Sequence, residues 1–343
     1  MNFLSDTTAP AHPDLLAALS EANDGFAPSY GADPVSARVK TRLKDLFETD
    51  LEVLFATAGT ASNALALSVL APPDSIILCH DEAHIHRDER GAPEFFTGGA
   101  KLVPLHGDHA KIDPSGLVAD LGSWPADFVH ATPPSVLSIS QLNEAGGAHT
   151  IDELDALIAP AQSAGLAIHM DGARFANALA ALECSPAEMS WKRGVDALCL
   201  GATKNGAMAA EAVILFPSVM DRFQALQARQ KRGGHMLPKM RYVAAQFDAW
   251  LRDDLWLKLA RDANDAGRRL AQGLSALPGC ALAHPCDGNE VFAQLSAEVV
   301  ERLRKAGAGF YAWPDGSARF VASWCTSDED IEAILRAARG EAA

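Results

Sequence analysis

Several familiar signatures are missing from this 343-residue sequence. It has no apolar run near the ~20 residues that a membrane span requires. The N-terminal segment MNFLSDTTAPAH lacks the basic start and the apolar stretch of a secretory signal. The formal net charge is −15, so the basic surface that neutralises nucleic-acid phosphates is lacking. We therefore expect a cytoplasmic protein that binds a small molecule, and neither a nucleic acid nor a membrane.

Cysteine, glycine and metal motifs are absent as well. The six cysteines form no CxxC pair, which favours free thiols in a reducing compartment, although Cys280 and Cys286 could pair in principle. The sequence has no GxGxxG in a strand-to-helix turn and no Walker A motif, which argues against dinucleotide and P-loop nucleotide sites. The stretch HDEAHIH (80–86) resembles a metal site, but in an extended chain its last two histidines point to opposite sides. With no HExxH motif present, we expect no metal.

Short apolar runs alternate with helical segments through the first two thirds of the chain. This alternation favours βαβ units and a mostly parallel sheet. Beyond residue 218 the pattern becomes helical and ends in an α+β tail. We expect a large domain over 1–245, including the N-terminal segment, and a small C-terminal α+β domain over 246–343. The expected strands are 51–57, 75–80, 99–105, 127–132, 136–140 (a strand of its own or an extension of the one before), 166–171, 195–201, 211–217, 290–295 and 317–324. The expected helices are 34–48, 151–165 with Thr150 as its cap, 297–306 and 328–339.

The most informative stretch runs from residue 167 to residue 207. Asp171 ends one apolar run, and Lys204 follows another within GATKNGA. A carboxylate at such a strand end can hold a pyridinium N–H, or it can cap the next helix. A desolvated lysine among small residues can form an imine, although most lysines are solvated. Together they are the two protein groups that pyridoxal phosphate (PLP) chemistry most needs.

Other residues could bind anions. Gly59 and Thr60 lie in AGTASN, between an expected strand and helix, where free N–H groups and the helix dipole favour a phosphate. An ordinary capped turn is the alternative. Thr203, next to the lysine, could also contact a phosphate. Arg174 and Arg319 could hold a carboxylate through two hydrogen bonds. A surface salt bridge is the alternative for Arg174, whereas Arg319 lies within an apolar run and needs a partner there.

Two histidines are candidates for proton transfer. An imidazole can stack on a planar cofactor and can act as an acid or base near neutral pH. His84 follows the expected strand 75–80, and His130 lies in FVHAT. Because a lone histidine near a strand is more often structural, neither residue establishes a site by itself.

In this combination the sequence resembles the threonine aldolase family of PLP enzymes, which has the aspartate aminotransferase-like fold (fold type I). The resemblance covers nearly the whole chain, and its most specific parts are HMDGAR and the lysine that follows it. Supporting segments are SDT (5–7), SYGAD (29–33), AGTASN (58–63) and AHIHRDERG (83–91). Ala32 and Ala58 depart from the family pattern.

The resemblance implies roles for individual residues. It implies PLP as the cofactor and Lys204 as its Schiff-base lysine, with His84 stacked on the ring. It also implies that His130 handles the β-hydroxyl of the substrate. The residues that it implies at the cofactor or the substrate carboxylate are Ser5, Tyr30, Gly59, Thr60, Asp171, Arg174, Thr203 and Arg319.

One departure concerns the segment KRGGHMLPKMR (231–241). The family often carries an arginine there that reaches the PLP phosphate across a subunit interface, but Leu237 occupies that position. Lys231, Arg232 or Lys239 could replace it, and the sequence does not choose among them. The resemblance implies a homodimer or homotetramer with active sites at the dimer interface.

The expected reaction is retro-aldol cleavage of L-threonine, L-allo-threonine or a related L-β-hydroxy-α-amino acid to glycine and an aldehyde, with phenylserine as a further candidate. The alternative is another fold type I activity, namely a β-eliminating lyase, an aminotransferase or an amino-acid racemase. These enzymes share the lysine and the aspartate. A binding protein without catalysis is disfavoured because Lys204, Asp171 and two arginines occur together.

Overall fold

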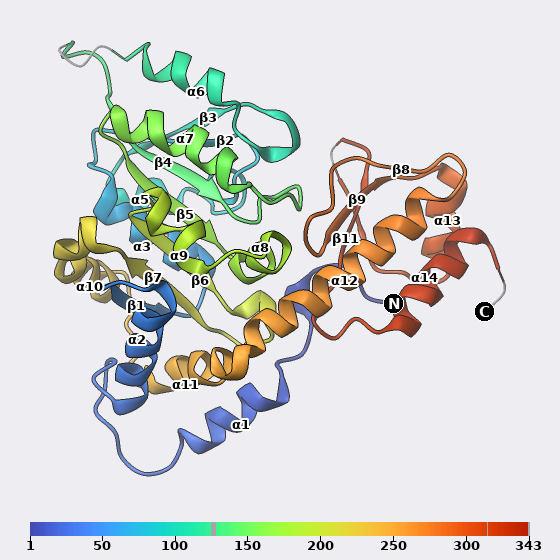
Figure 1. The fold of residues 1–343 in the computed structure, drawn as a ribbon, viewed down its shortest axis with the longest axis horizontal. Helices are drawn as coiled ribbons and strands as arrows, with labels where there is room; N and C mark the ends of the chain where they lie inside the picture. The colour runs from blue at the N-terminus through green and yellow to red at the C-terminus, as the bar shows by residue number, and fades with distance from the viewer. Residues whose placement is uncertain (125–127, 314, 342–343) are drawn as a thin grey trace.

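The computed structural model describes residues 1–124, 128–313 and 315–341, which form two lobes joined by a long helix, α12 (Leu255–Ser275) (Figure 1). The larger lobe contains a seven-stranded sheet in the order β1-β7-β6-β5-β4-β2-β3. β7 runs antiparallel to its two neighbours, and the other strand pairs are parallel. Its strands are β1 (Glu52–Ala56), β2 (Ile76–His80), β3 (Lys101–Leu105), β4 (Pro134–Ser140), β5 (Ala167–Gly172), β6 (Ala197–Gly201) and β7 (Glu211–Leu215). The predicted mostly parallel α/β sheet is confirmed.

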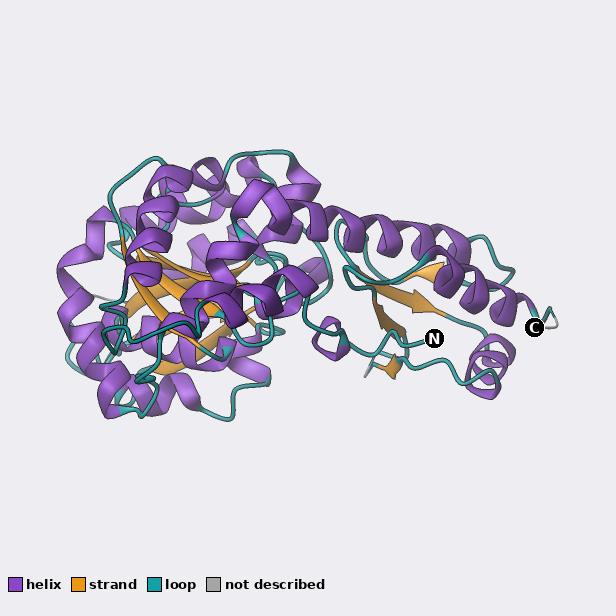
Figure 2. Cartoon of the chain, turned by 90° about the horizontal axis from the view of Figure 1, so that it is seen from below, coloured by secondary structure: helices purple, strands orange, loops and turns teal. Residues whose placement is uncertain are grey.

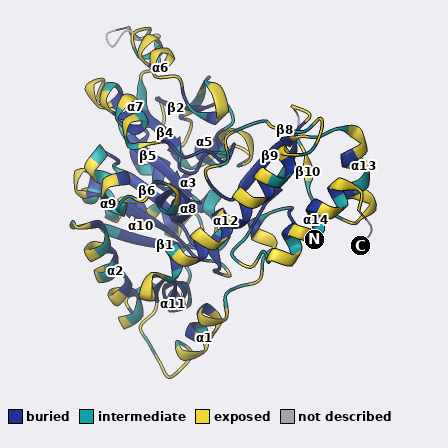
Figure 3. Ribbon diagram, turned by 45° about the vertical axis from the view of Figure 1, so that its right-hand side comes forward, coloured by how far each residue is buried: buried dark blue, intermediate teal, exposed yellow. Residues whose placement is uncertain are grey.

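Helices cover both faces of this sheet, because each strand sends alternate side chains to opposite sides. In β2, Ile76 and Leu78 enter one apolar core, whereas Ile77 and Cys79 enter the other. Figure 3 shows the buried strands between these two helical layers. The first face is covered by α1 (Pro13–Glu21), α2 (Pro34–Phe47), α6 (Pro114–Leu121), α7 (Ile151–Ser163), α8 (Phe175–Leu182), α9 (Pro186–Met189) and α11 (Arg241–Trp250). The second is covered by α3 (Gly59–Leu70), α4 (His84–Arg87), α5 (Ala92–Thr97) and α10 (Phe223–Arg232).

Local sequence signals set the helix starts. Thr150 accepts a hydrogen bond from the backbone N–H of Glu153, and the Glu153 side chain accepts one from the Thr150 N–H. This capping box confirms the predicted cap of α7. At the start of α2, Asp33 accepts a hydrogen bond from the backbone N–H of Ser36, and Pro34 occupies the first helical position. Proline is suited to this position because a backbone N–H there would have no acceptor within the helix.

The smaller lobe contains a four-stranded antiparallel sheet in the order β10-β11-β9-β8, with helices packed against it (Figure 2). Phe3 lies in its core, and Asn2 forms a bridge to Gly309. The N-terminal segment therefore packs against the small lobe, whereas we had expected it in the large domain. The elements of this lobe are β8 (Ala281–Leu282), β9 (Glu290–Gln294), β10 (Tyr311–Ala312), β11 (Ala318–Val321), α13 (Ala297–Lys305), α14 (Asp328–Arg339) and the second half of α12.

The change from one core to the other occurs within α12. Leu259 and Ala260 belong to the core of the larger lobe, and Ala266 and Leu270 belong to that of the smaller lobe. The expected boundary at 245/246 instead falls inside α11, whose buried side chains all pack in the larger lobe. Packing therefore passes from one core to the other between Ala260 and Ala266, later in the chain than residue 245, because one continuous helix contributes to both cores.

One expected strand is wrong. Residues 128–132 form an exposed loop, and residue 127 lies outside the described residues. Phe128 and Val129 are 55% and 90% exposed, so this short apolar run joins no core. The strand begins only at Pro134, which makes β4 a strand of its own.

Two further observations bear on the sequence-based expectations. All six cysteines are free. Among the described residues, no helix is long and apolar enough to cross a membrane.

Candidate active site

Polar residues gather where β4, β5 and β6 end. In the sheet register Ser140 lies beside Asp171, and Asp171 beside Cys199. Because β7 runs the opposite way, its first residue, Glu211, pairs with Gly201 at the same edge. The carboxyl edge of an open parallel sheet is the usual place for a ligand.

Lys204 lies in a short 3₁₀ turn (Thr203–Asn205) directly after β6. The turn is anchored on both sides, since Trp250 Nε1 donates to Asn205 O (2.9 Å) and Asn205 Nδ2 donates to Trp256 O (2.8 Å). The side chain of Lys204 is half-buried, and its charge lowers the pKa of Asp171. The Lys204 amine is therefore carried at the site by a turn whose backbone is held in place by hydrogen bonds.

Asp171 is buried, with both carboxylate oxygens hydrogen-bonded. Oδ2 accepts from Asn63 Nδ2 (2.7 Å), and Oδ1 accepts from the backbone N–H of Ala173 (3.0 Å). Burial acts to raise the pKa of Asp171, but the charges of His84 and Lys204 and the bond from Asn63 outweigh it, so the pKa lies below its usual value. Asp171 is thus ionised at neutral pH and is available as an acceptor for a protonated ring nitrogen.

His84 begins the short helix α4. Its Nδ1 lies 2.8 Å from Glu89 Oε1, and Asn63 Nδ2 donates to the same oxygen (2.9 Å). The hydrogen bond to Glu89 raises the pKa of His84 above its ordinary value, although burial acts against it. One asparagine thus connects Asp171 with the histidine through Glu89, a link that the sequence motif did not reveal.

The histidine-rich segment differs in one respect from our expectation. Residues 84–87 are helical rather than extended, so the argument from alternating side chains does not apply to them. His84 Nδ1 faces Glu89, and His86 Nδ1 donates to Asp81 O (3.0 Å). In the part of the chain that the structure describes, no three or more histidine, cysteine or acidic side chains gather as metal ligands.

Two acids at this edge, the half-buried Glu144 and the buried Glu211, were missed by the sequence analysis. Glu144 Oε1 accepts from the backbone N–H of His84 (2.8 Å) and from Ser140 Oγ (2.7 Å), and burial raises the pKa of Glu144 to about 7. Burial likewise raises the pKa of Glu211 to about 7, beside Thr203 and Lys204. Glu211 opens an apolar run in the sequence, whereas Glu144 lies in a polar and glycine-rich segment that gives no such signal.

The two predicted arginines lie in one buried cluster of charges. Arg174 Nε donates to Asp6 Oδ2 (2.8 Å), and its Nη1 lies 2.9 Å from Glu290 Oε2. Arg319 Nη2 donates to the other oxygen of Glu290 (2.6 Å). The structure thus brings Arg174 and Arg319 together, with a carboxylate between them that the sequence analysis did not identify.

The turn with Gly59 and Thr60 begins α3. Ala58 precedes the helix and supplies no side-chain cap, so the first N–H groups of a 12-residue helix lack a side-chain acceptor. An ideal Cβ on Gly59 would meet no atom within 4 Å. This end of the helix can therefore accept an anion such as a phosphate.

Two other predicted residues are exposed on loops. Tyr30 is half-exposed on the loop between α1 and α2, and its ring lies under Lys231 Nζ, 5.0 Å from the ring centre. His130 is exposed in the loop before β4. β4 runs from this loop toward the site, so His130 lies at its opposite end. Within one chain, therefore, only His84 of the two predicted histidines lies at the site.

Ser5 lies beside the Lys204 turn, because the 3₁₀ turn that it precedes packs against Thr203–Asn205. The three basic candidates for a phosphate lie on another segment. Ser5 caps a 3₁₀ turn that begins at the buried Asp6, next to the arginine cluster. The basic residues are exposed on the segment around α10 and its following loop; they are Lys231, Arg232 and Lys239.

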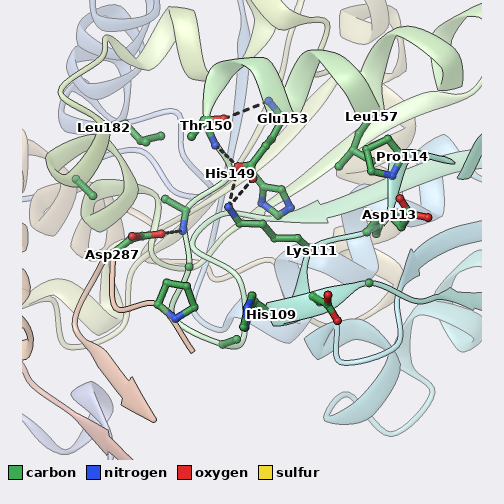
Figure 4. Close-up of a pocket in the computed structure, with 18 of the residues that line it drawn as sticks. His109, Lys111, Asp113, Pro114, His149, Thr150, Glu153, Leu157, Leu182 and Asp287 are labelled. Atoms are coloured by element: carbon green, nitrogen blue, oxygen red, sulfur yellow. Dashed lines mark hydrogen bonds and ion pairs between the residues drawn. The ribbon is translucent and has the colours of Figure 1, made fainter. Parts of the chain in front are cut away.

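A large cleft of about 1700 Å³ lies elsewhere (Figure 4). The segment around Lys111, the start of α7, α12 and the loop at Asp287 line it. Lys111 is paired with Glu153 at 2.7 and 2.9 Å, and Asp287 accepts from the backbone N–H of Ala148. These three charged groups therefore already have partners, and none of the predicted site residues lines the cleft.

The geometry agrees with comparisons to known proteins. The family model of the beta-eliminating lyases matches residues 2–298. A low specificity L-threonine aldolase of Pseudomonas aeruginosa is 42% identical over 338 residues, which cover 98% of this chain and 96% of that protein. The chain belongs to this family of threonine aldolases. Another low specificity L-threonine aldolase, from a Pseudomonas species, is 39% identical over 343 residues, which cover 98% of this chain and 98% of that protein.

Solved structures support the same fold. The threonine aldolase of Leishmania major superposes with a TM-score of 0.91 at 26% identity, over 99% of this chain and 98% of that one. Serine palmitoyltransferase of Sphingomonas wittichii has a TM-score of 0.72 at 18% identity, over 99% of this chain and 86% of that one. The predicted fold type I architecture is confirmed.

Proposed function

We propose that this protein is a PLP-dependent aldolase that cleaves L-threonine, L-allo-threonine or a related L-β-hydroxy-α-amino acid, phenylserine included, to glycine and an aldehyde. The observation that carries the proposal is the placement of Lys204 beside ionised Asp171 at the carboxyl edge, in a chain 42% identical to a named L-threonine aldolase. An amine and a carboxylate in this relation are the two groups that PLP binding and chemistry most require.

Orphaned polar groups in the site fit PLP. Asn63 Oδ1 and Glu89 Oε2 are buried without a hydrogen-bond partner, and the uncapped turn at Gly59 has room for a phosphate. Lys204 would bind the aldehyde carbon, Asp171 the ring nitrogen, and the α3 N-terminus with Thr203 the phosphate. When bound, PLP supplies an electron sink for the bonds at Cα of the amino acid.

The residues of the chain supply the rest of the chemistry. Arg319 would hold the substrate carboxylate, since an arginine can do so through two parallel hydrogen bonds. This orients the Cα–Cβ bond, and orientation of reacting groups accounts for several kcal/mol of barrier reduction. His84, held by Glu89, would take the proton of the β-hydroxyl, directly or through water. Arg174 would support this site without contacting the substrate, because it is already hydrogen-bonded to Asp6 and ion-paired with Glu290.

Further parts of the proposal concern assembly and location. We propose a cytoplasmic homodimer or homotetramer with active sites at the dimer interface. His130 could reach a site only in a neighbouring copy, because its loop lies at the far end of β4 within its own chain. One of the exposed residues Lys231, Arg232 and Lys239 would contact the phosphate across that interface.

The lysine provides the first test. We expect Lys204→Ala to lose covalently bound PLP, its borohydride-sensitive visible absorbance and its turnover. The matched control is Lys192→Ala, which removes an exposed lysine paired with Glu48 and should retain all three. A Lys204→Ala protein that keeps covalent cofactor and turnover would contradict the assignment. Formation of a keto acid or a racemised amino acid in place of glycine would favour a sister fold type I reaction.

A further inference from the structure

A buried network joins the two lobes next to the proposed substrate position. Asp6, Arg174 and Glu290 are 2%, 7% and 1% exposed, and the side chain of Arg319 is 14% exposed. Two positive charges face two negative charges, so the cluster is balanced without a ligand. Arg174 comes from the larger lobe, whereas Glu290 and Arg319 lie on neighbouring strands of the smaller lobe.

The two arginines differ in how many of their guanidinium nitrogens already have an acidic partner. Arg174 uses Nε and Nη2 on Asp6 and Nη1 on Glu290, so all three of its nitrogens have an acidic partner. Arg319 has one such bond, from Nη2 to Glu290, and its guanidinium lies 5.2 Å from the ring centre of Trp313. Its Nε is buried and has no acceptor among the described residues. A buried, unsatisfied donor is costly unless an acceptor arrives.

Glu290 is fixed by its surroundings. It lies on β9, and an ideal Cβ on Gly146 would come within 2.7 Å of its backbone oxygen, so the loop after β4 packs directly against it. One carboxylate oxygen accepts a hydrogen bond from Arg319 at 2.6 Å, and the other forms an ion pair with Arg174 at 2.9 Å without a hydrogen bond. Because strands hold side chains more rigidly than loops do, this carboxylate can fix the direction of a long, flexible arginine.

We propose that Glu290 is a positioning residue for carboxylate recognition. It ties the Nη2 side of Arg319 to Arg174, so that the remaining donors of Arg319 are preset for the α-carboxylate of the amino-acid substrate. The inference rests on the proposed function in that it takes an amino acid as the ligand. It divides the labour between the arginines: Arg319 binds the substrate, and Arg174 supports it through Glu290.

The test compares two ligands that differ in the carboxylate alone. Glycine and glycinamide are titrated into PLP-loaded protein, and their Kd values are read from the absorbance change of the bound cofactor. We expect Glu290→Gln to raise the Kd of glycine about tenfold, the size of one charge-assisted hydrogen bond, and to leave that of glycinamide unchanged. Asp248→Asn is the matched control, because Asp248 is another buried carboxylate held by arginines, Arg38 and Arg42; it should change neither Kd.

Two results would overturn the proposal. Equal weakening of both ligands would assign Glu290 a merely structural role. An unchanged or lower Kd for glycine would mean that Glu290 competes with the substrate for Arg319. If Glu290→Gln does not fold, Glu290→Asp retracts the carboxylate by one methylene, keeps the charge, and should show the same loss for glycine alone. Wild-type protein that binds glycine with this carboxylate dependence but makes no glycine from threonine would contradict the proposed function and leave this inference intact.

Discussion

Asn63 is the residue whose replacement tests the site geometry most sharply. Its amide nitrogen donates to Asp171 at 2.7 Å and to Glu89 at 2.9 Å, and the residue is 2% exposed. Asn63→Ala removes both hydrogen bonds at once and leaves two neighbouring buried carboxylates without their shared donor. Each hydrogen bond to a charged group contributes about 1.5–3 kcal/mol. Asp171 keeps the N–H of Ala173 and Glu89 keeps His84, so we expect the lower end, about 3 kcal/mol in total.

The loss should depend on pH in a defined direction. Burial already raises the pKa of Glu89, and hydrogen bonds from His84 and Asn63 oppose this. Without Asn63 that pKa rises further in the folded state. An acid with a raised folded pKa destabilises the protein above its unfolded pKa, and this cost disappears as pH falls. The destabilisation should therefore be larger near about pH 8 than near about pH 5.

Urea unfolding of the wild type and Asn63→Ala at the two pH values measures both effects. Asn177→Ala is the matched control, because Asn177 is 3% exposed but donates to the neutral side chain of Asn264 (2.9 Å). It should cost about 1 kcal/mol at either pH. An Asn63→Ala protein no less stable than this control, or with a cost that does not vary with pH, would refute the proposed link between the two carboxylates.

Two further perturbations have defined outcomes. The hydrogen bond to Glu89 raises the pKa of His84, so the stability that this pair contributes is present below the ordinary histidine pKa and is lost as pH rises through the folded value. In urea unfolding, His84→Asn should therefore flatten this part of the plot of stability against pH. An unchanged plot would disprove the coupling. Gly146→Ala should destabilise by at least about 2 kcal/mol in the same assay, because the residue has φ +78° and a Cβ would clash with Glu290 O. Gly165→Ala, at φ +81° with no atom within 4 Å, should cost only about 1 kcal/mol, and equal losses for the two variants would argue against the clash.

Most of the fold could be predicted from local patterns. The capping box at Thr150 and the alternation in β2 are short-range signals, because helix caps and strand faces are set by residues a few positions apart. The loop at 128–132 has the composition of a strand, and only its exposure after folding shows otherwise. The changeover between the two cores leaves no break in the sequence pattern, because α12 continues from one core into the other.

The candidate site was predicted less completely. Lys204, Asp171 and His84, to which we assign the chemistry, stand in recognisable motifs. The groups that orient them do not, because their partners are distant in sequence: Asn63 is 108 residues from Asp171, and Asp6 is 168 residues from Arg174. Burial decides whether an acid such as Glu144 has an ordinary pKa or one raised to about 7, and burial follows from the assembled sheet.

The central claim, cleavage of the Cα–Cβ bond of L-β-hydroxy-α-amino acids, is tested most directly by product analysis. PLP-loaded protein is incubated with L-threonine, L-allo-threonine, L-phenylserine and, as a control, D-threonine, and the products are followed by NMR. The account predicts glycine and the matching aldehyde in equal amounts from one or more of the L substrates and none from D-threonine. The absence of glycine from every L substrate, or 2-oxobutyrate in its place, would contradict it.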